Sequence, residues 1–130
     1  MIVVDASVLA PALADDNTDG DRARERLRGE RLAAPELIDL EVVVTMRRAA
    51  RAKRLDERRS AQALTDLAAL PLRRVPHLPL LARVWELRDN FSAYDASYIA
   101  LAEALGTVLL TADGRVERAA GIRCQVAVLN

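Results

Sequence analysis

Two acidic residues stand just after runs of apolar residues that have the composition of buried strands. Asp5 ends the run 2–4, and Asp113 comes three residues after the run 108–110. A carboxylate at the lip of a buried sheet loses hydration, so its charged form needs a compensating partner. These two positions therefore predict acids that require a cation, a hydrogen-bond donor or a proton.

Two further acids lie on predicted helices, at positions that share a face with apolar residues. Glu41 comes four residues after Leu37, and the spacing of Leu37, Leu40 and Val44 predicts a buried stripe on this helix. Asp95 precedes apolar or aromatic residues by three, four and seven positions, so it is predicted to face inward from its own helix. An acid on a buried helix face requires a partner, because charged groups are rarely buried alone.

Each of the four acids also has a purely structural interpretation. Asp5 could begin the next helix as its N-cap, and Asp113 could be a turn residue before a glycine. Glu41 could form a core ion pair with an arginine, and Asp95 could complete a capping box with Ser92. Taken one at a time, the acids leave these alternatives open.

A single shared role would account for all four acids together. The carboxyl ends of parallel strands and the starts of the following helices meet at one edge of a sheet, so the acids can converge there. Clustered carboxylates repel one another, and a hard divalent cation such as Mg²⁺ relieves that repulsion. A carboxylate-bound Mg²⁺ can activate a water and stabilise the leaving oxygen in phosphodiester hydrolysis. We therefore expect a metal-dependent phosphodiesterase site.

Short apolar runs alternate with longer helical patterns along the chain, which predicts helices on both faces of a parallel sheet. The expected fold class is α/β, a three-layer α/β/α sandwich with a mostly parallel central sheet of about five strands. The predicted strands are 2–5, 32–34, 72–75, 107–110 and 125–129, and the predicted helices are 7–14, 19–28, 35–51, 56–70, 79–88, 93–105 and 113–120.

Length and composition limit the possible classes of protein. A chain of 130 residues, 52% hydrophobic and 29% charged, predicts one domain with a core of its own. The single Cys124 excludes an internal disulfide and a cysteine-based zinc site, and the single His77 excludes a two-histidine ribonuclease mechanism. No apolar run approaches the length of a membrane span and no targeting segment precedes the first strand, so we expect a cytoplasmic protein without membrane contact.

Nineteen basic and nineteen acidic residues give a net charge of zero, so any nucleic acid must be bound by a local patch. The basic stretch 47–54, extended by Arg58 and Arg59, is one candidate, and its alternative is a solvated helix end. Arg115, beside Asp113, is the better candidate for a phosphate contact. Aromatic residues make up only 3% of the chain, so stacking on bases has few sites, and Trp85 is predicted to pack in the core.

Four segments together resemble PIN-domain ribonucleases of the VapC toxin type, over essentially the whole chain. Met1-Ile-Val-Val-Asp5-Ala-Ser7 is similar to the family's opening strand, and Pro35-Glu-Leu-Ile-Asp-Leu-Glu41 to the helix of its second acid. The segment 94–102, Tyr-Asp-Ala-Ser-Tyr-Ile-Ala-Leu-Ala, resembles the third motif and is the most specific. The segment 110–115, Leu-Thr-Ala-Asp-Gly-Arg, resembles the fourth.

The resemblance implies a single PIN domain over residues 1–130 and an endoribonuclease toxin. It implies Asp5 and Asp95 as the main ligands of Mg²⁺, or of Mn²⁺, and Ser7 and Thr111 as hydroxyls that hydrogen-bond the carboxylates. It also implies an RNA substrate, a homodimer and a cognate antitoxin. The implied catalytic residues are Asp5, Glu41, Asp95 and Asp113.

Two other functions remain open from the residues. A catalytically silent PIN-like module that binds RNA or a partner would keep the fold without turnover. A phospho-accepting receiver domain has a similar length and an acidic metal site, but it needs adjacent acids after the first strand and an acid after the third. Here Asp5 stands alone and the run 72–75 ends without an acid.

Overall fold

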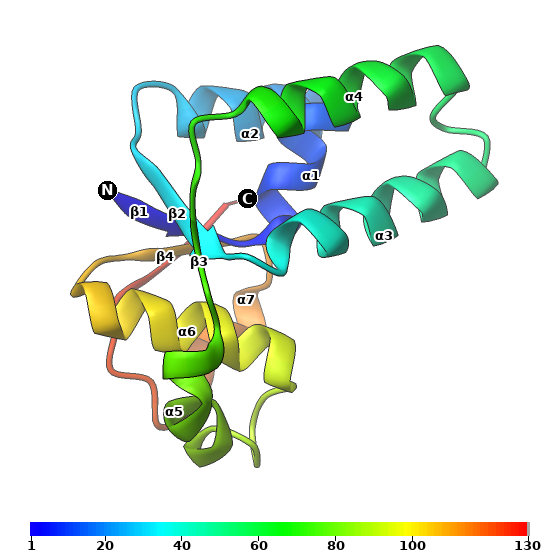
Figure 1. The fold of residues 1–130 in the computed structure, drawn as a ribbon. Helices are drawn as coiled ribbons and strands as arrows, with labels where there is room; N and C mark the ends of the chain where they lie inside the picture. The colour runs from blue at the N-terminus through cyan, green and yellow to red at the C-terminus, as the bar shows by residue number, and fades with distance from the viewer. Residues whose placement is uncertain (130) are drawn as a thin grey trace.

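The computed structural model describes residues 1–129, and it places one five-stranded sheet at the centre of an α/β fold (Figure 1). All four pairs of neighbouring strands are parallel. The predicted fold class is confirmed. The strands follow the order β3-β2-β1-β4-β5 and are β1 (Ile2–Val4), β2 (Leu32–Pro35), β3 (Arg73–Val75), β4 (Leu109–Thr111) and β5 (Val126–Val128).

Helices cover both faces of the sheet and complete three layers. Figure 1 shows α1 and α2 on one face and α5 and α6 on the other. Both faces need cover because every residue of β1, β2 and β4 is buried. The helices are α1 (Ala6–Ala14), α2 (Thr18–Leu27), α3 (Ile38–Arg51), α4 (Glu57–Ala69), the 3₁₀ helix η1 (Leu78–Leu80), α5 (Leu81–Glu86), α6 (Ala93–Leu105) and α7 (Gly114–Arg118).

The chain reverses its direction across the sheet between β1 and β4. It moves outward from β1 to β2 and β3, then returns to place β4 and β5 on the other side of β1. Parallel sheets bind their ligands outside the carboxyl ends of the strands at such a switch point. Because Val4 is in register with Leu110, Asp5 and Thr111 emerge side by side there. The strand order also differs from the 2-1-3-4-5 order of receiver domains, which excludes that alternative.

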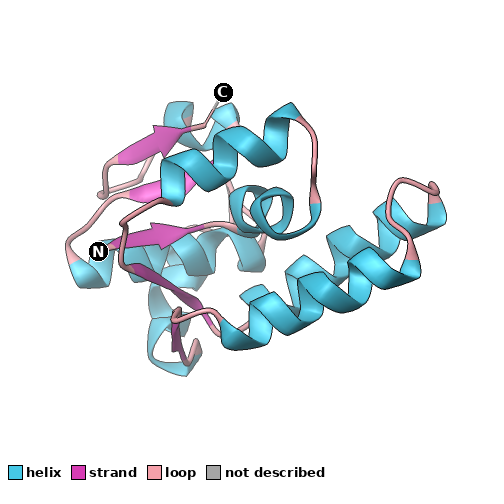
Figure 2. Cartoon of the chain, turned by 90° about the horizontal axis from the view of Figure 1, so that it is seen from above, coloured by secondary structure: helices cyan, strands magenta, loops and turns pink. Residues whose placement is uncertain are grey.

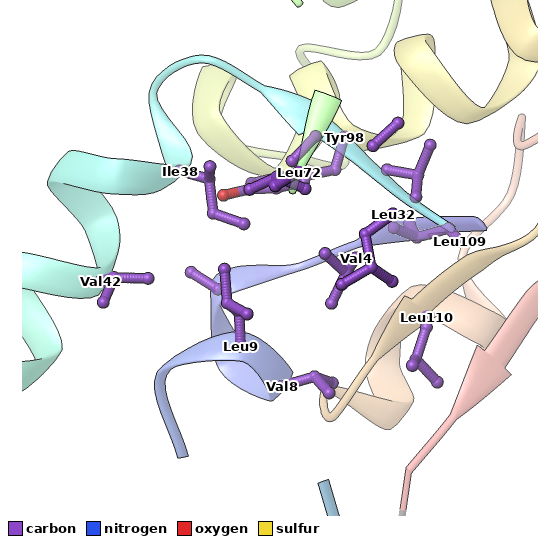
Figure 3. Packing of buried hydrophobic residues seen from close by; sticks show 14 of the residues in the cluster. Val4, Val8, Leu9, Leu32, Ile38, Val42, Leu72, Tyr98, Leu109 and Leu110 are labelled. Carbon is purple, nitrogen blue, oxygen red and sulfur yellow. The ribbon is translucent and has the colours of Figure 1, made fainter. Parts of the chain in front are cut away.

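The core lies between β1 and the helices on either side of it. In Figure 3, Leu9 of α1 and Tyr98 of α6 lie on opposite sides of β1, which contributes Val4. The middle of α6 is buried on every side, from residue 96 to residue 102, as expected for a helix held between the sheet and α5. No helix among residues 1–129, α6 included, is both long and apolar enough to cross a membrane.

The beginnings of two helices show how far local signals determine the boundaries. Ser92 Oγ accepts a hydrogen bond from the Asp95 N–H at 3.1 Å, so α6 begins where the predicted cap places it. The helix predicted to start at Pro35 begins instead at Ile38, because Pro35 completes β2 as its last residue.

The prediction that Trp85 packs in the core is wrong. Its side chain is 67% exposed, and the Arg88 guanidinium lies 4.3 Å from the centre of its ring. The helix α5 has only six residues, and the buried positions of this region are taken by Leu80 before it and Leu87 after it.

The helices α3 and α4 form an antiparallel hairpin that extends well beyond the edge of the sheet (Figure 2). Its turn contains Lys53 in the left-handed backbone region, with a φ of 59°. Leu55, which lies between the two helices in the sequence, is buried at this end of the hairpin. The α3 helix therefore starts next to the switch point and ends far from it, where the hairpin is surrounded by solvent.

Candidate active site

The site is built at the carboxyl ends of β1 and β4. Asp5 follows β1 directly and caps α1, with its Oδ1 accepting a hydrogen bond from the Ser7 N–H at 3.3 Å. Its own N–H donates to the Leu110 carbonyl at 3.0 Å, which ties it to β4. The N-cap interpretation of Asp5 is therefore confirmed, and it leaves the second carboxylate oxygen for other partners.

Thr111, the fully buried last residue of β4, organises this part of the site. Its Oγ1 donates to Asp5 Oδ2 at 2.9 Å and accepts from the Asp113 N–H at 3.1 Å. Ser7 Oγ lies 3.4 Å from Thr111 Oγ1 and accepts from the Ala112 N–H at 3.0 Å. Since the single hydroxyl proton of Thr111 is used on Asp5, Ser7 is the donor between the two hydroxyls.

The surroundings of Asp5 oppose its ionisation. Burial is the largest influence and raises the pKa of the Asp5 carboxyl above its ordinary value of 3.8. Hydrogen bonds from Thr111 and Ser7 act in the opposite direction, and the negative charge of Asp95 adds to the rise. Asp5 is thus held firmly in place in a setting that favours either a proton or a cation.

Glu41 reaches the same site from the first turn of α3. Its Oε1 accepts a hydrogen bond from the hydroxyl of Tyr98 on α6. Burial again is the largest influence on its pKa, which is raised, and the charges of Asp5 and Asp95 raise it further against the opposing Tyr98 bond. The core ion pair with an arginine is absent among the described residues, because the partner of Glu41 is a tyrosine.

The predicted reason for the inward position of Glu41 is wrong, although the position itself is confirmed. Leu40 and Val44 of the predicted stripe are 72% and 56% exposed. The buried face of α3 is formed instead by Ile38, Val42 and Met46. Glu41 adjoins that face and is half-buried because Tyr98 lies over it.

Asp95 combines both interpretations that its sequence position allowed. Its backbone N–H completes the Ser92 cap, while its half-buried side chain lies in the first turn of α6. The charge of Asp95 is close enough to Asp5 and Glu41 to raise the pKa of both. The structure therefore places three of the four predicted acids at one end of the sheet, within electrostatic reach of one another: Asp5, Glu41 and Asp95.

Asp113 is linked to the site through its backbone, while its carboxylate is engaged elsewhere. The side chain caps α7 and binds the Arg115 guanidinium, with Nε at 3.0 Å and Nη2 at 2.8 Å from its two oxygens. Hydrogen bonds from Arg115 are the largest influence and lower the pKa of Asp113. Asp113 is therefore a helix N-cap and not a turn residue before Gly114, and it stands apart electrostatically from the other three acids.

The donor chemistry of the site fits a hard divalent cation with a largely aqueous coordination shell. Within residues 1–129, no three Asp, Glu, His or Cys side chains lie close enough together to form a complete metal cluster. Mg²⁺ commonly keeps several waters and takes only one or two carboxylates from the protein. Asp5, oriented by Thr111 and repelled by Asp95, satisfies that smaller requirement.

Tyr98 is a residue of the site that sequence reasoning counted only as part of an apolar face. It is 1% exposed, and burial followed by the Glu41 contact raises the pKa of its hydroxyl, so it remains a proton donor. A tyrosine three residues after an inward-facing acid carries a polar group into the same layer. That spacing was the available signal.

Comparison with known proteins identifies the relatives of this chain. The model of the PIN domain matches residues 2–122. Ribonuclease VapC9 of Mycobacterium tuberculosis is 43% identical over 129 residues, which cover 99% of this chain and 98% of that protein. The crystal structure of VapC20 from the same species superposes with a TM-score of 0.72 at 17% identity, covering 95% of this chain and 97% of the other.

A second solved structure shares the same fold. It is a toxin–antitoxin complex from Klebsiella pneumoniae, and the matched chain gives a TM-score of 0.67 at 20% identity, covering 100% of this chain and 98% of the other. The two superpositions show that the fold described above is shared with these structures. The family match spans nearly the whole chain, and the sequence identity extends over the same residues. The chain belongs to the PIN-domain family, among the relatives named VapC ribonucleases.

Proposed function

We propose that this protein is a Mg²⁺-dependent endoribonuclease and the toxin of a toxin–antitoxin pair. The observation that carries the proposal is the group formed by Asp5, Glu41 and Asp95 at the switch point of the sheet. Two of these acids have raised pKa values, and none of the three forms an ion pair with another residue among 1–129. The names of the relatives, which are ribonucleases, support the same chemistry.

Asp5 and Asp95 would hold the metal ion, with Mn²⁺ as a possible substitute for Mg²⁺. When bound, the ion supplies positive charge to the phosphate and lowers the pKa of a coordinated water. Thr111 fixes the orientation of Asp5, and Tyr98 fixes that of Glu41, whose free oxygen can orient the attacking water. Hydrolysis adds this water to phosphorus, breaks the bond to the leaving sugar oxygen, and returns a proton to that oxygen.

Arg115 would assist at the phosphate. In the structure its guanidinium is bound to Asp113, and its side chain is 84% exposed. A planar guanidinium can bind a phosphate in the same two-pronged geometry that it uses on a carboxylate. We therefore expect Arg115 to contact the substrate and Asp113 to complete the acidic group around the water.

Two protein partners form part of the proposal. The structure from Klebsiella pneumoniae holds a chain of this fold with its antitoxin, which supports a cognate antitoxin for this chain. Leu40, Val43 and Val44 form an exposed apolar strip on α3, and such a strip favours burial against a second copy of the chain. A homodimer is the state that we expect in solution.

The decisive experiment measures cleavage of a mixed pool of structured RNAs in Mg²⁺ or in EDTA. The Asp95→Asn variant keeps the size and the helix cap but removes the charge, so we expect cleavage to fall at least about a hundredfold with an unchanged circular dichroism spectrum. Asp89→Asn, which removes an exposed acid in the preceding loop, is the matched control and should cleave normally.

Three results would contradict the proposal. Cleavage that persists in EDTA would show that the reaction does not need a metal ion. Cleavage that persists in Asp95→Asn would show that Asp95 serves only the start of its helix. RNA binding without cleavage by the wild-type protein, with Mg²⁺ and Mn²⁺ each supplied, would favour the silent binding module instead.

A further inference from the structure

The far end of the α3–α4 hairpin, residues 47–58, carries a group of six cations, and we call it the basic arm. All six are exposed, and none forms an ion pair with another residue among 1–129. Figures 1 and 2 show this end of the hairpin standing clear of the rest of the molecule. The six cations are Arg47, Arg48, Arg51, Lys53, Arg54 and Arg58.

The charge of the basic arm is local and unbalanced. The whole chain has a net charge of zero, yet these six cations share the segment with only two acids, Asp56 and Glu57. Cations near a helix C-terminus are favoured by its dipole, but that effect is limited to the last turn. Arg47 precedes the last turn of α3, and Arg58 lies in the first turn of α4, where the dipole disfavours a cation, so the dipole does not account for the whole group.

The basic arm is joined to the candidate active site by one face of α3. Glu41, Thr45 and Arg48 are spaced by four and three residues, which places them on one side of the helix. Thr45 and Arg48 are both exposed, so this side is open from the site to the arm. At 1.5 Å per residue, Arg48 lies roughly 10 Å from Glu41 along the helix axis, and Arg51 lies roughly 15 Å away.

The chemistry of the basic arm indicates which part of a nucleic acid it fits. Five of its six cations are arginines, whose guanidinium groups suit phosphate oxygens. The aromatic side chains that could stack on bases all lie between residues 85 and 98, and none is on the arm. The arm therefore matches the sugar–phosphate backbone and is indifferent to the base sequence.

We propose that the basic arm binds the phosphate backbone of the RNA substrate a few nucleotides away from the bond that is cleaved. The inference rests on the proposed function for the identity of the substrate. It adds an anchoring surface that is separate from the acidic site and that acts on long RNA alone. A short substrate that fills only the acidic site would not reach the arm.

The test measures equilibrium binding of a labelled 20-nucleotide RNA in EDTA, across a salt series, by fluorescence anisotropy. The arm variant is Arg48→Gln/Arg51→Gln, since glutamine keeps good helix propensity. The control is Arg31→Gln/Arg73→Gln, which removes two exposed cations from the amino ends of β2 and β3, at the opposite edge of the sheet. Both variants lose the same net charge.

We expect the arm variant to bind about ten- to thirtyfold more weakly near 0.1 M salt, with a salt slope smaller by about 1.4, because each phosphate contact on a single strand contributes about 0.7. The control should bind within about twofold of the wild type. In Mg²⁺, cleavage of the long RNA should fall in the arm variant, while cleavage of a dinucleotide should not change.

Equal weakening in the arm and control variants would overturn the inference, since it would indicate only a general effect of charge. So would unchanged RNA binding in the arm variant, or competition by polyglutamate as strong as that by unlabelled RNA, which would assign the arm to an acidic protein. The outcome is separable from that of the proposed function. If the arm variant binds RNA more weakly while the wild type does not cleave RNA, the role of the basic arm in binding is supported and the proposed nuclease activity is refuted.

Discussion

Two parts of this molecule hold partly buried carboxylates, and they treat them in opposite ways. At the switch point, burial raises the pKa values of Asp5 and Glu41, and no guanidinium or ammonium group offsets the charge. Between α5 and α6, burial also opposes ionisation of Glu103, but its oxygens receive Arg83 Nε at 2.6 Å, Arg83 Nη2 at 3.1 Å and the Arg123 N–H at 2.7 Å. These bonds lower the pKa of Glu103.

The difference separates a structural acid from an acid that is available for chemistry. Glu103 fastens α6 to α5 and to the segment before β5, and its charge is neutralised by Arg83. The acids of the switch point are oriented by hydroxyl groups, which fix a carboxylate without neutralising it. A carboxylate held in that manner keeps its affinity for an external cation.

The largest expected effect is at the structural acid. Arg83→Met removes the cation and leaves Glu103 in a pocket where the two side chains are only 17% and 11% exposed. We expect a loss of about 3 kcal/mol in the free energy of unfolding, measured by urea denaturation. Arg88→Met, on an exposed residue next to α5, should cost less than about 1 kcal/mol. Similar losses of unfolding free energy in the two variants would show that Glu103 does not depend on its ion pair with Arg83, and the contrast with the acids of the switch point would fail.

A smaller effect of opposite sign is expected at the site. Glu41→Gln removes a repelled charge but keeps an oxygen to accept the Tyr98 hydroxyl. In EDTA we expect the variant to be more stable than the wild type by about 0.5 to 1 kcal/mol. Titration calorimetry with Mn²⁺ should show weaker binding by the variant. Glu25→Gln, at an exposed ion pair on α2, is the control. A marked loss of stability would show that Glu41 has a structural role.

The smallest expected effect is a difference in pH dependence. Folding raises the pKa values of Asp5 and Glu41, so their ionisation at neutral pH destabilises the folded state. This destabilisation disappears as the pH falls through the raised pKa values toward the ordinary ones, because the folded protein takes up the protons first. Folding lowers the pKa of Glu103, so its stabilisation is complete above the ordinary value of 4.5 and is lost below it.

Urea denaturation in EDTA between about pH 7 and pH 5 measures this contrast. The stability gain of Glu41→Gln over the wild type should shrink by a few tenths of a kcal/mol as the pH falls. The stability loss of Glu103→Gln should stay constant over the same range. A gain for Glu41→Gln that grows on acidification would mean that folding does not raise the pKa of Glu41.

The order of the elements could be predicted from the sequence, because each has a local signal. Ser92 marks the start of α6 and Gly106 its end, where the backbone has a φ of 63° that glycine adopts without strain. The start of α3 had an ambiguous signal and was misplaced. Pro35 is compatible with the first turn of a helix and with the end of a strand, and only its pairing with β3 decides between them.

The site was predictable at the level of residues but not of contacts. The positions of Asp5, Glu41 and Asp95 were correctly assigned to one edge, because a parallel sheet brings its strand ends together. The stripe that placed Glu41 was wrong because α3 buries the face formed by Ile38, Val42 and Met46, so that Leu40 meets solvent and not the core. The engagement of Asp113 by Arg115 depends on the geometry of one turn, which residue spacing alone does not define.

The hydrogen bond from Thr111 to Asp5 joins residues that are 106 positions apart in the chain. At a synthesis rate of about 5 to 20 residues per second, Asp5 is added to the growing chain roughly 5 to 20 s before Thr111. Until β4 is added, β1 has β2 on one side and an open edge on the other. An unfinished chain therefore lacks the anchored carboxylate, and the site first forms when the last fifth of the protein is translated.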